Sequence, residues 1–124
     1  MTDFALKSPS VKEGVVVSTC IKLMEFYDLK PTRNNTFGVP YFYRTKDGEE
    51  RQGWIRGGRK GSSDILGVTK DGRTIAVECK RETGGMLSDA QKQYLADIEG
   101  RGGVALVVHS ARELEQKLKA AGVI

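Results

Sequence analysis

The first clear pattern along the chain is a run of apolar residues at helical spacing between positions 11 and 29. Residues three or four apart share one face of a helix, so this run predicts an amphipathic helix over that range. Ser10 and Glu13 have the spacing of a capping box at its start, and Pro31 is expected to end it. We expect residues 1–9 to form a flexible N-terminal arm.

Two more helices are predicted in the second half of the chain. Ser88 and Gln91 form a second capping-box pattern, which opens a helix that ends at Gly100. Ser110 and Glu113 form a third capping-box pattern at the start of the last helix. That helix is expected to turn three apolar residues inward, namely Leu114, Leu118 and Ala121.

Strand patterns lie between the first two helices and again between the last two. Residues 63–68 and 73–80 are short apolar runs separated by a turn, which predicts a hairpin. We interpret residues 33–46 and 50–56 as strand plus loop. The continuous apolar run 104–108 is typical of a strand buried on both faces. A right-handed crossover through the intervening helix should place this last strand parallel to strand 73–80.

The predicted order of elements is a helix, a strand meander, a helix, a strand and a helix, which indicates an α/β protein with a mixed sheet flanked by helices. With 124 residues and 39% hydrophobic content, the chain suits one domain over residues 10–124 with a single core. No apolar run is long enough to cross a bilayer, and the start lacks the pattern of a signal peptide. A soluble, cytoplasmic protein without a membrane partner is therefore expected.

Several kinds of active site find no support in the sequence. It has no serine-nucleophile motif, no phosphate-cradling loop and no dinucleotide fingerprint, so no nucleotide cofactor is expected. His109 is the single histidine, and its place after an apolar run suits a strand end better than a catalytic base. Cys20 and Cys79 lack zinc-ligand spacing, and we expect both to be buried as small apolar residues.

The hairpin carries the most informative residues of the chain, Asp64, Glu78 and Lys80. Side chains alternate along a strand, so Glu78 and Lys80 project from the same face. A two-residue loop would place Asp64 opposite Cys79 and turn it away from Glu78. A three-residue turn that ends in a left-handed Gly72 would instead place Asp64 opposite Glu78. We predict this second register, in which the two carboxylates lie close enough to share one cation.

Simpler interpretations of these residues stay open. Asp64 could be an ordinary turn residue, and Glu78 with Lys80 could form the solvated face of an edge strand. Like charges directly opposite one another destabilise a sheet unless a cation lies between them. The predicted register therefore itself favours a bound ion.

Basic residues gather in the segment 30–60, which holds eight Lys or Arg residues against three Asp or Glu. The net charge of the whole chain is only +4, so this excess is local. Lysine and arginine hold phosphates, and the segment therefore favours a nucleic-acid partner. A solvated Gly-rich loop is the simpler explanation of the same charges.

The order of short motifs in the second half of the chain is distinctive. Gly61-x-x-Asp64 is followed by Glu78-Cys79-Lys80, by Gly85-x-Leu87-Ser88-x-x-Gln91, and by Gly102-Gly103-Val104-Ala105 before the closing helix. Together these motifs resemble the VRR-NUC family of the PD-(D/E)XK nuclease superfamily, and the likeness extends from about Ser10 to Leu118. Ser63 stands where many relatives have proline. The resemblance implies a restriction-endonuclease-like α-β-β-β-α-β-α core.

The resemblance also implies roles for the hairpin residues. Asp64 and Glu78 would bind Mg²⁺, or Mn²⁺ in its place, together with the backbone carbonyl of Cys79. Hard oxygen donors suit both ions. Lys80 would position or deprotonate the attacking water and offset charge on the phosphate.

Two helix residues match further site positions of such enzymes. Glu13 would complete the surroundings of the metal and Gln91 would contact the site, although both residues also fit capping positions. Contacts to nucleic acid are expected from five basic residues, namely Arg33, Arg56, Arg59, Lys60 and Arg81.

Stand-alone relatives of this family form homodimers and cut branched DNA, such as four-way (Holliday) junctions. The resemblance therefore implies a metal-dependent endonuclease of branched DNA that acts as a homodimer, and so compact a chain would suit a phage-encoded protein in a bacterial host. Two alternatives stay open. One is a nucleic-acid-binding module that does not cut, and the other is a metal nuclease of the same fold that reads a sequence or acts on RNA.

Overall fold

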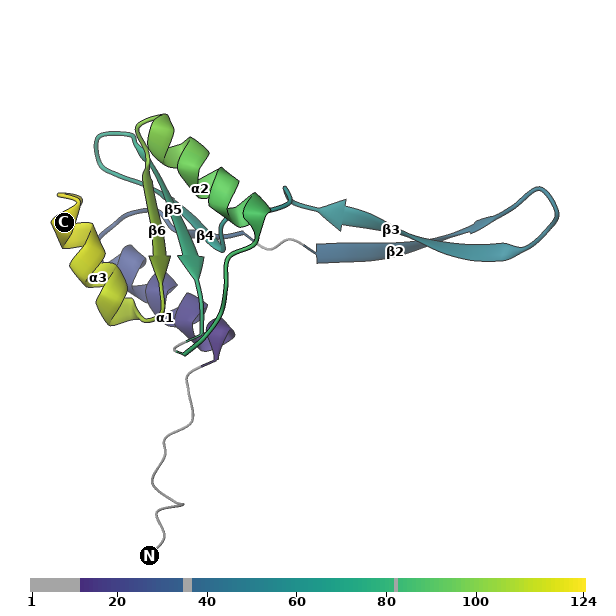
Figure 1. The fold of residues 1–124 in the computed structure, drawn as a ribbon, viewed down its shortest axis with the longest axis horizontal. Coiled ribbons are helices and arrows are strands. Elements are labelled where there is room, and N and C mark those ends of the chain that lie inside the picture. The colour runs from purple at the N-terminus through teal and green to yellow at the C-terminus, as the bar shows by residue number, and fades with distance from the viewer. Residues whose placement is uncertain (1–11, 35–36, 82) are drawn as a thin grey trace, which may run out of the picture.

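The described residues form two separate β-sheets, one within the body of the protein and one outside it (Figure 1). The computed structural model describes residues 12–34, 37–81 and 83–124. The predicted N-terminal arm, residues 1–9, and the predicted cap Ser10 lie outside these residues. The elements follow in the order α1 (Glu13–Phe26), β1 (Thr32–Arg33), β2 (Phe37–Arg44), β3 (Glu50–Gly57), β4 (Ile65–Val68), β5 (Thr74–Cys79), α2 (Asp89–Gly100), β6 (Val104–Val108) and α3 (Ala111–Ala120).

The body is built on a four-stranded sheet in the order β1-β4-β5-β6, with β4 antiparallel and β6 parallel to β5. Alternation along β5 directs Ile75, Val77 and Cys79 into the core formed with α1 and α3, and directs Glu78 and Lys80 toward α2. This arrangement confirms the predicted mixed sheet flanked by helices and the parallel last strand. The predicted α-β-β-β-α-β-α order appears when β2 and β3 are treated as an insertion between β1 and β4.

The turn between β4 and β5 sets the register of their hairpin. Gly72 has a left-handed φ of +89°, and its N–H donates to the Thr69 carbonyl at 3.0 Å. The Thr69 N–H donates to the Arg73 carbonyl at 2.9 Å. This is the three-residue turn that the sequence predicts. The ladder of β4 and β5 continues from it in the register that places Asp64 opposite Glu78.

Helix α1 is shorter than the apolar pattern predicts. It begins after Lys12, whose side chain makes no capping hydrogen bond. At its other end Asp28 has a left-handed φ of +55°, and the N–H of Leu29 donates to the Met24 carbonyl at 2.9 Å. This Schellman arrangement ends the helix, so Pro31 is not what stops it.

The two described capping patterns differ in completeness. At α2 the Ser88 hydroxyl accepts the Gln91 N–H at 3.1 Å and the Gln91 side chain accepts the Ser88 N–H at 2.9 Å, which confirms a full capping box. At α3 the Ser110 hydroxyl accepts the Glu113 N–H at 3.0 Å. The Glu113 carboxylate instead accepts the His109 N–H at 3.0 Å, one residue before the cap, so the third capping box is only half formed.

Two predicted burials are wrong. Ala121 follows the last residue of α3 and is exposed, whereas Leu114 and Leu118 are buried as expected. Strand β6 lies at the edge of the sheet, so only its end residues Val104 and Val108 are buried and the three between them are partly exposed. Among the described residues, no helix is both long and apolar enough to cross a membrane.

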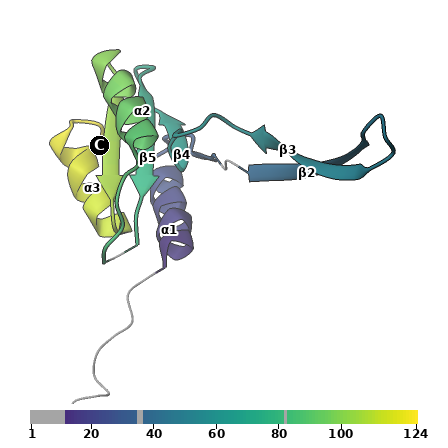
Figure 2. The same ribbon diagram turned by 45° about the vertical axis from the view of Figure 1, so that its right-hand side comes forward.

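Residues 37–57, which we call the arm, form a hairpin of two eight-residue strands rather than the predicted strand plus loop. In the described chain β2 and β3 contact one another and no other helix or strand. The arm extends away from the body in both views (Figures 1 and 2).

Candidate active site

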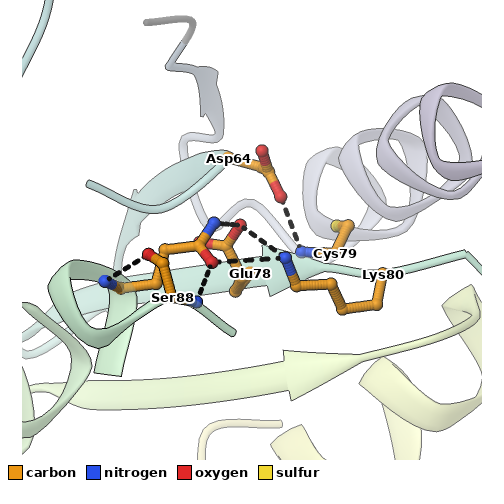
Figure 3. Close-up of polar contacts among 6 residues, drawn as sticks. Asp64, Glu78, Cys79, Lys80 and Ser88 are labelled. Carbon is orange, nitrogen blue, oxygen red and sulfur yellow. Dashed lines mark hydrogen bonds and ion pairs between the residues drawn. The ribbon is translucent and has the colours of Figure 1, made fainter. Parts of the chain in front are cut away.

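The carboxylates of Asp64 and Glu78 meet at one end of the β4–β5 hairpin. Asp64 directly precedes β4, and its Oδ2 accepts the backbone N–H of Cys79 at 2.8 Å (Figure 3). Glu78 lies on β5 and is only 1% exposed. The Asp64 carboxylate lies close enough to Glu78 to raise its pKa, as expected for two acids on one face of a hairpin.

Gly61 lies where this end of the hairpin packs against α2. Its φ of +82° favours glycine, and an added Cβ would lie 2.6 Å from the backbone carbonyl atoms of Ala90. The segment that leads to Asp64 therefore packs closely on the first turn of α2. As a result, Asp64, Glu78 and Gln91 come together from three consecutive parts of the chain: the residue before β4, strand β5 and the first turn of α2.

Gln91 connects Glu78 of β5 with Lys80, which directly follows that strand. Its Nε2 donates to Glu78 Oε1 at 2.8 Å, and its Oε1 accepts from Lys80 Nζ at 3.4 Å. The same Oε1 accepts the Ser88 N–H at 2.9 Å. Lys80 Nζ also lies 3.8 Å from Glu78 Oε1 (Figure 3). Gln91 thus contacts Glu78 and Lys80 and caps its helix at once; its role in catalysis stays a prediction.

Burial raises the pKa of Glu78 to about 8, and the neighbouring Asp64 carboxylate adds to this effect. Lys80 lowers the pKa, and the charge of Glu13 raises it. Glu13 is the first residue of α1 and not the third residue of a capping box. A capping-box role therefore does not explain why a glutamate stands at this position. The effect of Glu13 on the site is electrostatic: from the start of α1, its negative charge adds to the rise in the pKa of Glu78.

The donor set fits a hard divalent cation. Glu78 Oε2 is buried and, within the described part of the chain, has no hydrogen-bond partner. A buried carboxylate oxygen without a partner is costly unless something else satisfies it, and a cation shared with Asp64 would do so. No group of three or more His, Cys, Asp or Glu side chains with metal-binding geometry occurs in the described residues. A site with two carboxylates and several waters suits Mg²⁺.

The Cys79 side chain belongs to the core and not to the site. Cys79 and Cys20 are fully buried, as predicted, on the face of β5 opposite Glu78. Cys79 contributes its backbone N–H to the Asp64 carboxylate, while the use of its carbonyl as a metal ligand stays a prediction.

Some cations of the segment 30–60 are neutralised locally. Exposed ion pairs join Lys30 to Asp28, Arg44 to Glu50 and Arg51 to Glu49. The predicted contact residues Arg59 and Lys60 are exposed in the turn between the arm and Asp64, and they form no ion pair within the described residues. Arg33 is exposed at the end of β1 and Arg81 is exposed after Lys80, whereas the side chain of Arg56 lies outside the description.

Asn34 is a structural residue of the site that the sequence reasoning missed. Its backbone N–H donates to the Asp64 carbonyl at 2.8 Å. Its side-chain Nδ2 donates to the Ser62 hydroxyl at 2.7 Å and to the Ser63 carbonyl at 3.0 Å. An asparagine after a strand is only a weak sequence signal of such a role, because its hydrogen-bond partners lie far along the chain. Ser63 is fully buried, and its hydroxyl has no partner in the described chain.

A family model for the VRR-NUC domain matches residues 42–112, more than half of the 124 residues. The chain belongs to the VRR-NUC family. The matched range contains Asp64, Glu78, Lys80 and Gln91, and Glu13 lies before it. Neither a curated protein nor a solved structure matches the chain. Membership of the VRR-NUC family indicates a nuclease, and a nuclease implies a nucleic-acid substrate such as DNA.

Proposed function

We propose that this VRR-NUC protein is a divalent-metal-dependent endonuclease that hydrolyses phosphodiester bonds in branched DNA, such as four-way junctions, and acts as a homodimer. The observation that carries the proposal is the pair formed by the buried Glu78 and the half-buried Asp64. It combines an unpartnered carboxylate oxygen with an ammonium 3.8 Å from the same carboxylate group. The preference for branched DNA and the homodimer rest on the resemblance to stand-alone relatives.

Each residue of the site has its own role in the proposed phosphodiester hydrolysis. Asp64 and Glu78 would hold Mg²⁺ or Mn²⁺, which when bound supplies Lewis acidity and lowers the pKa of a water molecule. Lys80 brings a positive charge to the face on which negative charge develops on the phosphate, and it can orient the attacking water. Gln91 is a positioning residue, because its amide holds Glu78 and its carbonyl oxygen accepts from Lys80.

The proposal is tested with the purified protein, Mg²⁺ and a panel of duplex, flap, four-way junction and single-stranded DNA. We expect cleavage of the branched substrates that stops when EDTA removes the metal. Asp64→Asn, Glu78→Gln and Lys80→Ala should each lower the cleavage rate by at least about a hundredfold while DNA binding persists. Glu99→Gln is the matched control, because it neutralises an exposed carboxylate on α2 far along the helix from Gln91.

Two results would contradict the proposal. If Asp64→Asn and Lys80→Ala left cleavage unchanged, the chemistry would lie elsewhere. If the protein bound DNA but cut none of the panel with either metal, the non-catalytic binding module would be the better description. Cleavage of RNA substrates in place of DNA would identify a metal nuclease of different substrate class.

A further inference from the structure

The two faces of the arm carry different side chains. The pairs Pro40–Trp54, Phe42–Gln52 and Arg44–Glu50 follow from the register of β2 and β3. Since side chains alternate along each strand, Phe42 and Trp54 share one face, and Tyr41 and Tyr43 share the other.

The tyrosine face is partly covered by its own residues. The rings of Tyr41 and Tyr43 lie 5.9 Å apart, and the ring of Tyr41 lies across Gly53, where an added Cβ would come within 2.7 Å of its Cε1. The two tyrosines are 43% and 46% exposed. This face therefore helps to hold the two strands of the arm together.

The opposite face leaves its aromatic rings in solvent. Phe42 is 75% exposed and Trp54 is 65% exposed. A two-stranded ribbon on its own is only marginally stable in water, and large exposed rings add nothing to its stability. The rings of Phe42 and Trp54 are thus available to a ligand.

The base of the arm is tied to the candidate active site. Asn34, before β2, holds the segment Ser62–Asp64 after β3 by three hydrogen bonds. The exposed cations Arg59 and Lys60 lie in that same return segment. A ligand on the arm would therefore run past positive charge toward Asp64, as a nucleic-acid strand would.

We propose that the face of the arm that bears Phe42 and Trp54 stacks unpaired bases of the DNA substrate, while Arg59 and Lys60 contact the adjacent phosphates. The inference rests on the proposed function and names the part of the substrate that the arm binds: single-stranded or unstacked nucleotides next to the cleavage point. Every base has a π-face, so stacking on aromatic side chains tolerates any sequence.

The composition of this face favours bases over a second copy of the chain. A stable interface between copies needs about 800 Å² from each partner with an apolar centre. Here the two rings share their face with Pro40, with Gln52 and, toward the tip, with the Arg44–Glu50 ion pair at 3.0 Å. Two rings and one proline make only a small apolar centre, which suits isolated stacking platforms.

The fluorescence of Trp54 tests the inference directly, because Trp54 is the single tryptophan of the chain. The protein in EDTA is titrated with a twelve-nucleotide oligothymidylate and with a duplex of the same length. Saturable quenching by the single strand, and much weaker quenching by the duplex, is expected.

Phe42 variants separate ring stacking from apolar bulk. Phe42→Ala should weaken single-strand binding by roughly 5- to 150-fold, the range expected for one lost stacking contact. Phe42→Tyr should restore binding and Phe42→Leu should not, because leucine has no π-face. Phe26→Ala is the matched control, since Phe26 is an 80% exposed phenylalanine on α1 and not on the arm. An unchanged far-ultraviolet circular dichroism spectrum of each free variant verifies that the arm still forms.

Two outcomes would overturn the inference. In the first, single-stranded DNA binds without any change in Trp54 emission. In the second, Trp54 emission shifts with protein concentration in the absence of DNA and ignores added DNA, which would make the arm an interface between copies. The titration needs no cleavage, so it stands apart from the test of the nuclease: quenching without metal-dependent cleavage would reject the proposed function alone, and cleavage without quenching would reject the stacking alone.

Discussion

At the scale of single residues, Gln91 has two roles that one substitution can separate. Gln91→Glu keeps a side-chain oxygen for the Ser88 N–H, because glutamate is as good as glutamine at this position of a capping box. It replaces the amide donor to Glu78 with a third carboxylate beside Asp64. We therefore expect the helix cap to be kept and cleavage to be at least about tenfold slower, while thermal unfolding without metal shows a loss of about 1 kcal/mol from the donor that Glu78 no longer has. Thermal unfolding and junction cleavage with Mg²⁺ measure these two effects.

Gln91→Ala supplies the comparison for this prediction. It removes the donor to Glu78 and the acceptor for the Ser88 N–H, while the Ser88 hydroxyl still accepts the backbone N–H of residue 91, so stability should fall by about 1 to 2 kcal/mol together with activity. Full activity of Gln91→Glu would mean that Gln91 serves only its helix.

The residues of the site differ in how well the sequence predicts them. Asp64 and Glu78 are predictable because the turn at Gly72 is local and fixes which side chains face one another. The role of Asn34 is not predictable in this way. Its hydrogen-bond partners Ser62 and Ser63 lie far along the chain, and only the fold brings them near. The contact between Gln91 and Glu78 requires the packing of α2 on the sheet, so it is expected only through the family resemblance and not from local pattern.

At the scale of elements, the start of α3 depends on the charge of Glu113. Burial opposes ionisation of this group, but hydrogen bonds from His109 outweigh it and lower the pKa of Glu113. A lowered pKa means that the folded state favours the ionised form, so this stabilisation is present above the ordinary pKa of 4.5 and is lost as pH falls through the lower folded value.

Glu113→Gln should accordingly lower the free energy of unfolding by about 1 kcal/mol at pH 7 and by much less at pH 3. Thermal unfolding of both proteins from pH 3 to pH 7 measures the difference. Glu99→Gln, at an exposed carboxylate on α2, would serve as a control for loss of a carboxylate. A pH-independent difference would point to packing and not to charge.

The elements that the sequence predicts least well are those whose patterns lack a buried face. The ends of α1 shift because the helix is closed by Asp28 at a positive φ, where glycine is the usual signal. The arm shows no clean apolar and polar alternation, because aromatic residues occupy both of its faces and neither packs on the body. By contrast, the β4–β5 hairpin and α2 carry explicit turn and capping signals, and both are found where predicted.

At the scale of the whole molecule, the body should fold without the outer part of the arm. Replacing residues 42–52 by Asn-Gly keeps the pair of Tyr41 with Gly53, provides a tight turn and leaves Trp54 as a reporter. Because the arm contacts no element of the body in the described chain, we expect the free energy of unfolding to change by less than about 1 kcal/mol. Single-strand affinity should fall at least as far as in Phe42→Ala.

Chemical denaturation and the Trp54 titration measure these two quantities. Failure of the shortened protein to fold would show that the arm supports the body after all. Unchanged single-strand affinity would remove the outer arm from substrate binding.

The hydrogen bond from the Asn34 N–H to the Asp64 carbonyl, 2.8 Å long, closes the two ends of the insertion against each other. The segment between Asn34 and Asp64 leaves and re-enters the body at one place. Its length and sequence should therefore have little effect on the strands that position Asp64 and Glu78. An insertion attached in this way can be exchanged for another segment while the body stays the same. A foreign recognition hairpin spliced between these ends would be delivered at a fixed position beside the cutting centre, which offers a route to retargeting this small nuclease.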